Sequence, residues 1–202
     1  ENHARITAAK DGINHTVGGV AIGSGSTFHS SGSDGTVTIT GGEVEAYGAY
    51  GNGIGGGNSS SYAGGGATIN ITGGTVKANS IGGGNSAKGA GGDATITIDN
   101  DANVRLTKEG TDCDFCGIGG GNSLSGNGGK ATITVKSGTI NSDGSIGGGE
   151  GGGTGNGGDA TVNIYGGNLT AASIGGGTGS VGGHGGAAIV EVTDGFIETG
   201  SI

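Results

Sequence analysis

Short runs of alternating apolar and polar residues recur along the chain, and a glycine break follows each run. In residues 67–92, which read ATINITGGTVKANSIGGGNSAKGAGG, one run precedes the Gly73-Gly74 pair and a second run follows it. A serine-isoleucine step, a run of glycines and a polar loop complete the unit. Because strand side chains alternate between two faces, this pattern predicts short strands that each bury one face.

Nearly the same unit returns at residues 94, 131, 160 and 188, and aligning the copies brings aliphatic residues into four columns. β-branched residues dominate these columns, as is typical of strands. We expect each column to point inward and to stack. The first two columns are Val37, Ile69, Ile96, Ile133, Val162, Val190 and Ile39, Ile71, Ile98, Val135, Ile164, Val192. The third and fourth are Val44, Val76, Val104, Ile140, Leu169, Ile197 and Ile22, Ile54, Ile81, Ile118, Ile146, Ile174, Ile202.

The spacing of the copies predicts a stacked repeat. Successive copies start 27, 37, 29 and 28 residues apart from residue 67 onward, and the variation falls in the loops. Periods in this range are typical of solenoids. We therefore expect an all-β fold, a parallel β-solenoid (β-helix) of about six coils whose equivalent positions stack at about 4.8 Å. The expected copies are 34–66, 67–93, 94–130, 131–159, 160–187 and 188–202, after a degenerate N-terminal coil at 1–33.

Glycine makes up 57 of the 202 residues, and proline is absent. Glycine pairs such as Gly41-Gly42 suit corners that need a positive φ, and the IGGG runs would let opposing walls approach closely. An alternative is that these runs form polyglycine-II-like segments. The irregular glycine spacing excludes collagen, and the strict register of the β-branched residues argues against disorder. Since neither end shows a polar cap, we expect a fragment of a longer array or a unit that stacks end to end.

The outward positions of the first strand are rich in threonine and resemble the flat threonine arrays of ice-binding β-solenoids. This resemblance implies a face that binds ice, and a polysaccharide is an alternative ligand. The alternative without a binding role is that threonine is simply a common exposed strand residue. The next outward column is mixed, since it contains Asp99, Lys136 and Tyr165. The candidate binding residues are Thr36, Thr38, Thr68, Asn70, Thr95, Thr97, Thr132, Thr134, Thr161 and Asn163.

Two polar columns beside the glycine runs have a structural and a functional interpretation. Asn58, Asn85 and Asn122 could form a hydrogen-bonded ladder or could be ordinary turn residues. The GGDATITI segment is similar to calcium-binding glycine-rich repeats, in which an Asp binds the ion between coils. The aligned column reads Asp34, Gly66, Asp93, Lys130, Asp159, Ala187, and a ladder of ions would not tolerate its lysine. We expect no metal site and no cofactor, with isolated calcium left open.

Chemistry outside the repeat is sparse. Cys113 and Cys116 form a lone CxxC in an insertion, for which we favour a local disulfide over a free pair. Asp99, Asp101 and Arg105 are the candidates for a polysaccharide lyase or hydrolase, yet they fall at an irregular corner where solvated residues are common, so we expect no enzyme. Sequons for N-glycosylation occur at four asparagines, whose use depends on the source. They are Asn14, Asn58, Asn70 and Asn168.

The net charge of −9 argues against nucleic acid and against an anionic membrane surface as partners. The phrase ATINITGGTVKANSIGGG with its GAGG ending resembles glycine-rich repeat regions of large secreted or cell-surface proteins, chiefly bacterial. The resemblance covers roughly residues 34–202 and implies an extracellular stalk, fibre or adhesive surface. We therefore expect a non-catalytic structural segment that associates with itself end to end or with further repeats of the same chain.

Overall fold

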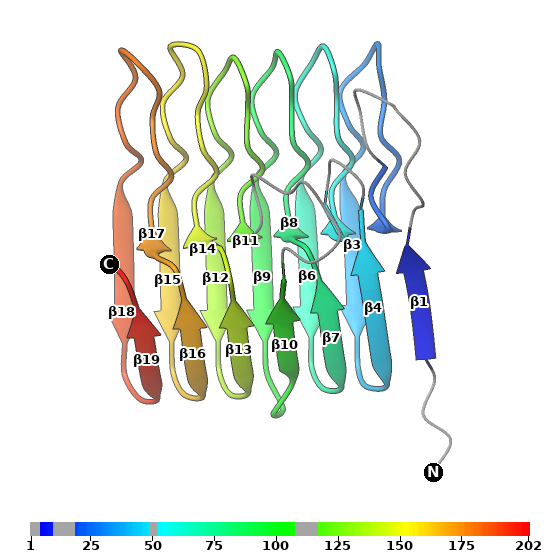
Figure 1. The fold of residues 1–202 in the computed structure, drawn as a ribbon, viewed down its shortest axis with the longest axis vertical. Coiled ribbons are helices and arrows are strands. Elements are labelled where there is room, and N and C mark those ends of the chain that lie inside the picture. Colours follow the sequence, from blue (N-terminus) through cyan, green and yellow to red (C-terminus); the bar gives the residue numbers. More distant parts are fainter. Residues whose placement is uncertain (1–4, 10–18, 49–51, 108–116) are drawn as a thin grey trace.

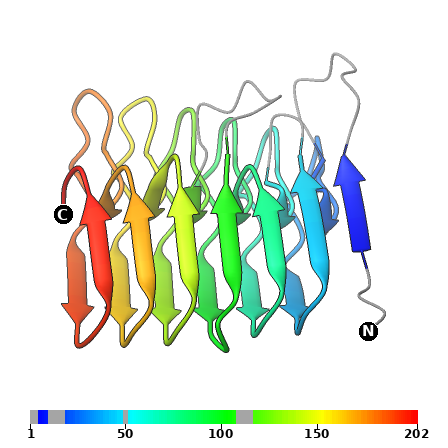
Figure 2. The same cartoon turned by 60° about the horizontal axis from the view of Figure 1, so that its bottom comes forward.

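The computed structural model describes residues 5–9, 19–48, 52–107 and 117–202. These residues form strands and turns, and the strands assemble into three parallel sheets wound as a β-solenoid of about six coils (Figures 1 and 2). The expected all-β solenoid is therefore confirmed. Each coil contributes one strand to each sheet, and the coils follow one another along the stack in chain order.

Sheet I takes the first alternating run of each copy, and sheet II takes the run after the glycine break. Sheet I contains β3 (Gly35–Ile39), β6 (Ala67–Ile71), β9 (Ala94–Ile98), β12 (Ala131–Val135), β15 (Ala160–Ile164) and β18 (Ala188–Val192). Sheet II contains β1 (Arg5–Ala9), β4 (Glu43–Tyr47), β7 (Thr75–Ala78), β10 (Asn103–Leu106), β13 (Thr139–Ser142), β16 (Asn168–Ala171) and β19 (Phe196–Thr199). Strand β1 lies in the stretch expected to be a degenerate coil, and it pairs with β4.

Sheet III consists of the short isoleucine-glycine steps that precede the glycine runs. Its strands are β2 (Ile22–Gly23), β5 (Ile54–Gly55), β8 (Ile81–Gly82), β11 (Gly117–Gly119), β14 (Ser145–Gly147) and β17 (Ile174–Gly175). The glycine-rich loops between sheets III and I project together from one side of the stack (Figure 1).

The core is the set of aliphatic columns, and the register matches the alignment of the copies. Ile96 lies between Ile69 and Ile133 on the neighbouring strands, and each of the three side chains is at most 1% exposed. A single coil buries little apolar surface, so this burial depends on the neighbouring coils. The last coil lacks a neighbour on one side, and Val192 is accordingly 47% exposed. Ile202, expected in the fourth column, follows the last strand and is exposed.

The corner between sheets I and II needs residues that accept a positive φ. Gly42 and Gly74 close two of these corners with φ values of 83° and 82°. In the copy that lacks the glycine pair, Asn100 and Asp101 take φ values of 51° and 54° instead. Asparagine and aspartate are the non-glycine residues that best tolerate this left-handed conformation. The NDAN sequence therefore makes the same corner by a different route.

Backbone hydrogen bonds hold the glycine-rich loops together in more than one direction. Within a coil, the Gly92 N–H donates to the Gly84 carbonyl (2.8 Å), and between coils the Gly121 N–H donates to the Gly92 carbonyl (2.8 Å). Other glycines donate to the equivalent segment of the next coil, as the Gly83 N–H does to the Gly119 carbonyl (3.0 Å). Bonds that leave a chain in several directions are expected of extended helices with three residues per turn, and not of a pleated strand. The pattern agrees with the polyglycine-II-like alternative.

Candidate functional site

The structure brings all ten predicted binding residues onto the outer face of sheet I. In the first column, Thr36 pairs with Thr68, and the series continues through the next three strands. In the second column, Thr97 lies between Asn70 and Thr134. Neighbouring strands lie about 4.8 Å apart, and alternate residues along a strand lie about 6.7 Å apart. The result is a regular array of two columns and five rows, which we call the threonine array.

Charged and bulky side chains border the threonine array. On one border, Lys136 forms an ion pair with Asp99, with Nζ 3.5 Å from Oδ2. On the other, Lys130 forms an ion pair with Asp159 at 3.2 Å. In β18 the array ends, because the two column positions are occupied by Ile189 and Glu191. The array is thus a bounded patch on one sheet and does not extend over the whole stack.

The aspartate column beside the array links successive coils. Oδ1 of Asp34 accepts the Gly66 N–H (2.7 Å), and Oδ1 of Asp93 accepts the Lys130 N–H (2.7 Å). Asp159 accepts the N–H of the next coil in the same way, at 3.0 Å. Each aspartate is followed in the next coil by a residue without a carboxylate, which avoids like charges on adjacent strands. These aspartates therefore have a structural role that does not require calcium.

The pKa of the Asp159 carboxyl is held below its usual value of 3.8 by these contacts. The largest cause is the backbone N–H of Ala187, and the second is the hydrogen bond from Lys130. Both favour the ionised form. Within the described residues, no three His, Cys, Asp or Glu side chains gather where they could hold a metal ion. The expectation of no metal and no cofactor stays a prediction, with isolated calcium as its alternative.

The asparagine column forms the ladder that the sequence left open. Oδ1 of Asn58 accepts the Asn85 N–H (2.8 Å), and Oδ1 of Asn85 accepts the Asn122 N–H (2.9 Å). The next residue along the chain in each copy is a serine, which the sequence analysis did not single out. The Ser123 hydroxyl donates to the Gly89 carbonyl of the previous coil (2.6 Å) and accepts the N–H of Gly126 (2.7 Å). The Asn-Ser pair, repeated after the glycines in three copies, is the sequence pattern that indicates both the asparagine ladder and the serine hydrogen bonds.

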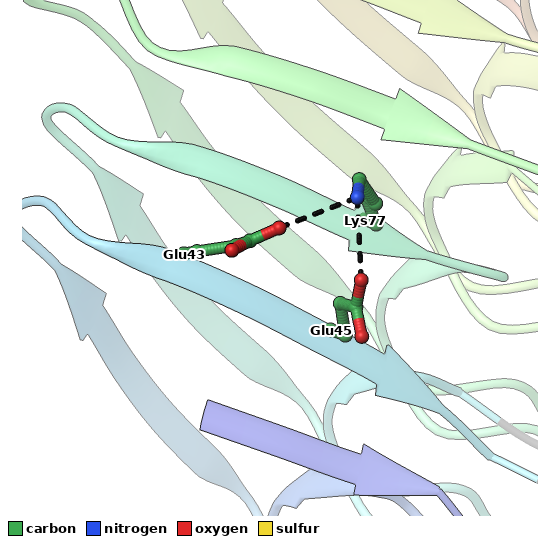
Figure 3. Close-up of polar contacts among 3 residues, drawn as sticks. All are labelled: Glu43, Glu45 and Lys77. Atoms are coloured by element: carbon green, nitrogen blue, oxygen red, sulfur yellow. Dashed lines mark hydrogen bonds and ion pairs between the residues drawn. The ribbon is translucent and has the colours of Figure 1, made fainter. Parts of the chain in front are cut away.

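Sheet II carries a charge cluster that sequence analysis missed. Nζ of Lys77 in β7 lies 3.3 Å from a carboxylate oxygen of Glu43 and 3.2 Å from one of Glu45, both in β4 (Figure 3). Hydrogen bonding to Glu45, and then to Glu43, raises the pKa of Lys77 above its ordinary value of 10.5. The cluster joins two neighbouring coils on the solvent face.

The three residues considered for catalysis lie at and next to the NDAN corner. Asp99 accepts the Asn100 N–H (2.8 Å) in addition to its ion pair with Lys136, and the Asp101 N–H donates to the Ser137 hydroxyl (3.0 Å). Arg105 is exposed on the outer face of β10. The backbone hydrogen bonds give Asp99 and Ser137 a role in closing the corner.

The remaining candidates differ in accessibility. Asn58 is 3% exposed and its side chain bonds the next coil, whereas Asn168 is exposed and Asn70 half-buried within the threonine array. Asn14 and the expected disulfide pair Cys113 and Cys116 lie outside the described residues. In the described part of the chain, no helix has the length and apolar character needed to cross a membrane.

We compared the chain with protein-family models, with curated proteins and with solved structures, and none of these comparisons gave a match.

Proposed function

We propose that this chain is a non-catalytic structural repeat, which forms part of an extracellular stalk, fibre or surface adhesin. The observation that carries the proposal is the unbroken register of all three sheets, from β3 to β18, from β1 to β19 and from β2 to β17. Polar ladders and backbone bonds run along the same axis. Such a stack is a spacer whose length is set by the number of coils.

The last coil supports association with a further coil, either from a second copy or from more repeats. Strands β18 and β19 are the edges of sheets I and II, and Ile189 and Phe196 are 64% and 61% exposed there. An open edge with apolar side chains is a template for strand pairing. A second copy of this chain is the occupant that can be tested directly.

Sedimentation velocity and electron microscopy over a range of concentrations test this association. We expect particles that lengthen with concentration, and we expect Val192→Lys in the edge strand to reduce the effect. Thr170→Lys, on the exposed outer face of β16, one strand in from the edge strand β19, is the matched control. A wild-type chain that remains monomeric at every concentration would refute end-to-end association. Labelling of intact source cells with an antibody against the chain tests the extracellular location, and a signal only after permeabilisation would contradict it.

A second candidate function is binding of ice or of a polysaccharide surface by the threonine array. The specific observation in its favour is the in-register placement of all ten residues on one face. Thr95→Tyr would place a bulky ring within the array, whereas Thr170→Tyr adds the same ring to sheet II. We expect thermal hysteresis or retention on a polysaccharide matrix to be lost in the first variant and kept in the second. Equal behaviour of the two variants, or no activity in the wild type, would remove this function.

A further inference from the structure

A polar groove of about 240 Å³ runs over sheet III, across strands β8, β11, β14 and β17. It crosses the strands and therefore follows the axis of the stack. Its central part consists of glycines in and after these strands, including Gly119, Gly147 and Gly175. Polar residues flank the glycines in chain order on both sides. Those before them are Ser80, Ser145 and Ser173, and those after them are Asn85, Asn122, Glu150 and Thr178.

The glycine floor carries no side chains, and between β11 and β17 its backbone is hydrogen-bonded from coil to coil. A Cβ at Gly119 or Gly147 would collide with a backbone carbonyl of the next coil, so side chains cannot fill this surface. The Gly120 N–H donates to the Gly147 carbonyl, and the Gly148 N–H donates to the Gly175 carbonyl, each at 3.0 Å. Recognition of a peptide by strand addition needs unpaired backbone groups. The floor instead suits a ligand that lies on it by van der Waals contact.

The flanking residues supply polar groups once per coil. The Ser173 hydroxyl donates to the Ser145 hydroxyl (2.7 Å), which places two hydroxyls from adjacent coils side by side. A hydroxyl has one donor and two acceptor positions, so Ser145 can still donate to a ligand. An acidic rim, with Asp143 and Glu150 among the lining residues, disfavours a polyanion. Repeated hydroxyl, amide and carboxylate groups beside a floor of glycines match a chain of uncharged polyhydroxylated units.

We propose that the groove over sheet III binds an extended neutral polysaccharide, which lies along the stack and contacts successive coils through Ser145, Ser173 and the polar residues that follow the glycines. This site is separate from the threonine array, since it lies on a different sheet. Its lining residues in β8, β11 and β14 come from coils within the stack, and β17 is the edge strand of sheet III.

The test is isothermal titration of the intact chain with a panel of neutral probes, namely cello-, manno- and chito-oligosaccharides. We expect at least one probe to bind. The double variant Ser145→Ala/Ser173→Ala should weaken it by about tenfold or more, because each neutral hydrogen bond contributes about a factor of five. The matched control, Thr139→Ala/Thr170→Ala, removes two hydroxyls from adjacent strands of sheet II, outside both candidate sites, and should leave the affinity unchanged. A further variant, Thr132→Ala/Thr161→Ala, removes two hydroxyls from the threonine array and tests whether the sugar binds there instead. Circular dichroism and a melting curve check that all three double variants keep the fold.

A second variant tests the steric requirement. Ser145 is exposed, so Ser145→Tyr keeps the fold and places a ring over the floor, and it should abolish binding. Three outcomes would overturn the proposal: no probe binds, the threonine-array variant loses affinity while the serine variant keeps it, or extended peptides displace the sugar more effectively than sugars do.

Discussion

Replacing Gly121 by alanine should clearly destabilise the protein, because backbone atoms occupy the space that the methyl group needs. A Cβ at Gly121 would lie well under 3.0 Å from backbone atoms of Gly83 and Gly84 in the previous coil. No flexible side chain is present there to move away. The loop must therefore shift relative to its neighbour by a large fraction of an ångström or more.

The magnitude follows from what the shift breaks. The Gly121 N–H donates to Gly92 and its carbonyl accepts from Gly129, each at 2.8 Å. Two lost hydrogen bonds cost about 2 kcal/mol, and overpacking costs about 1–3 kcal/mol, which together give about 3–5 kcal/mol. Gly41→Ala is the control, since a Cβ there meets nothing within 4 Å. Its effect should stay within about 0.5 kcal/mol or be slightly stabilising.

Urea unfolding followed by circular dichroism measures the difference. We expect the midpoint for Gly121→Ala to fall clearly, while Gly41→Ala stays close to the wild type. Because repeat stacks can unfold in parts, hydrogen exchange of the loop amides should show the loss concentrated in the coils that contain Gly84 and Gly121. Equal midpoints for the two variants would refute the close packing of the glycine loops.

Three further predictions concern the core and the charged contacts. Ile96→Ala should lower the free energy of unfolding by about 2–5 kcal/mol, because Ile96 is 1% exposed. Val190→Ala should lower it clearly less, because Val190 lies in the end coil and is only partly buried. Similar urea midpoints for the two variants would contradict this. The pKa of Asp159 is lowered by the N–H of the next coil and then by Lys130, so its contribution is present above its unfolded pKa and lost as pH falls through the folded value. The melting temperature of Asp159→Asn should therefore depend less on pH in the acid range than that of the wild type. An unchanged acid dependence would show that the Asp159 contacts do not contribute to stability. The pKa of Lys77 is raised by its two glutamates, so its contribution is present below 10.5 and lost as pH rises through the folded value. In Lys77→Met the melting temperature should depend less on pH in the alkaline range. An unchanged alkaline dependence would show that the contacts of Figure 3 do not stabilise the fold.

The strands and their register could be predicted because strand side chains have a period of two, and each copy repeats the period at aligned positions. Ile69, Ile96 and Ile133 therefore had to share one face of one sheet. The same alignment already placed Lys77 beside Glu45, although the outward residues of sheet II were not compared across copies.

The contacts of the glycine loops could not be read in the same way, because glycine carries no side-chain pattern. The sequence around Gly84, Gly92 and Gly121 does not distinguish a backbone hydrogen bond within a coil from one between coils. The aspartates illustrate a second limit. Asp93 in GGDATITI suggested calcium from its neighbours in sequence, whereas its partner, the Lys130 N–H, is 37 residues away. The position of the threonine array was predictable, but its ligand depends on groups outside the chain.

The differences in copy length all fall in loops and corners, while the strand columns keep their register. Duplication or loss of one whole copy in the gene would therefore change the reach of the molecule by one step of about 4.8 Å, with every new contact already present elsewhere in the stack. Selection could tune that reach through recombination alone, without waiting for point mutations to create an interface.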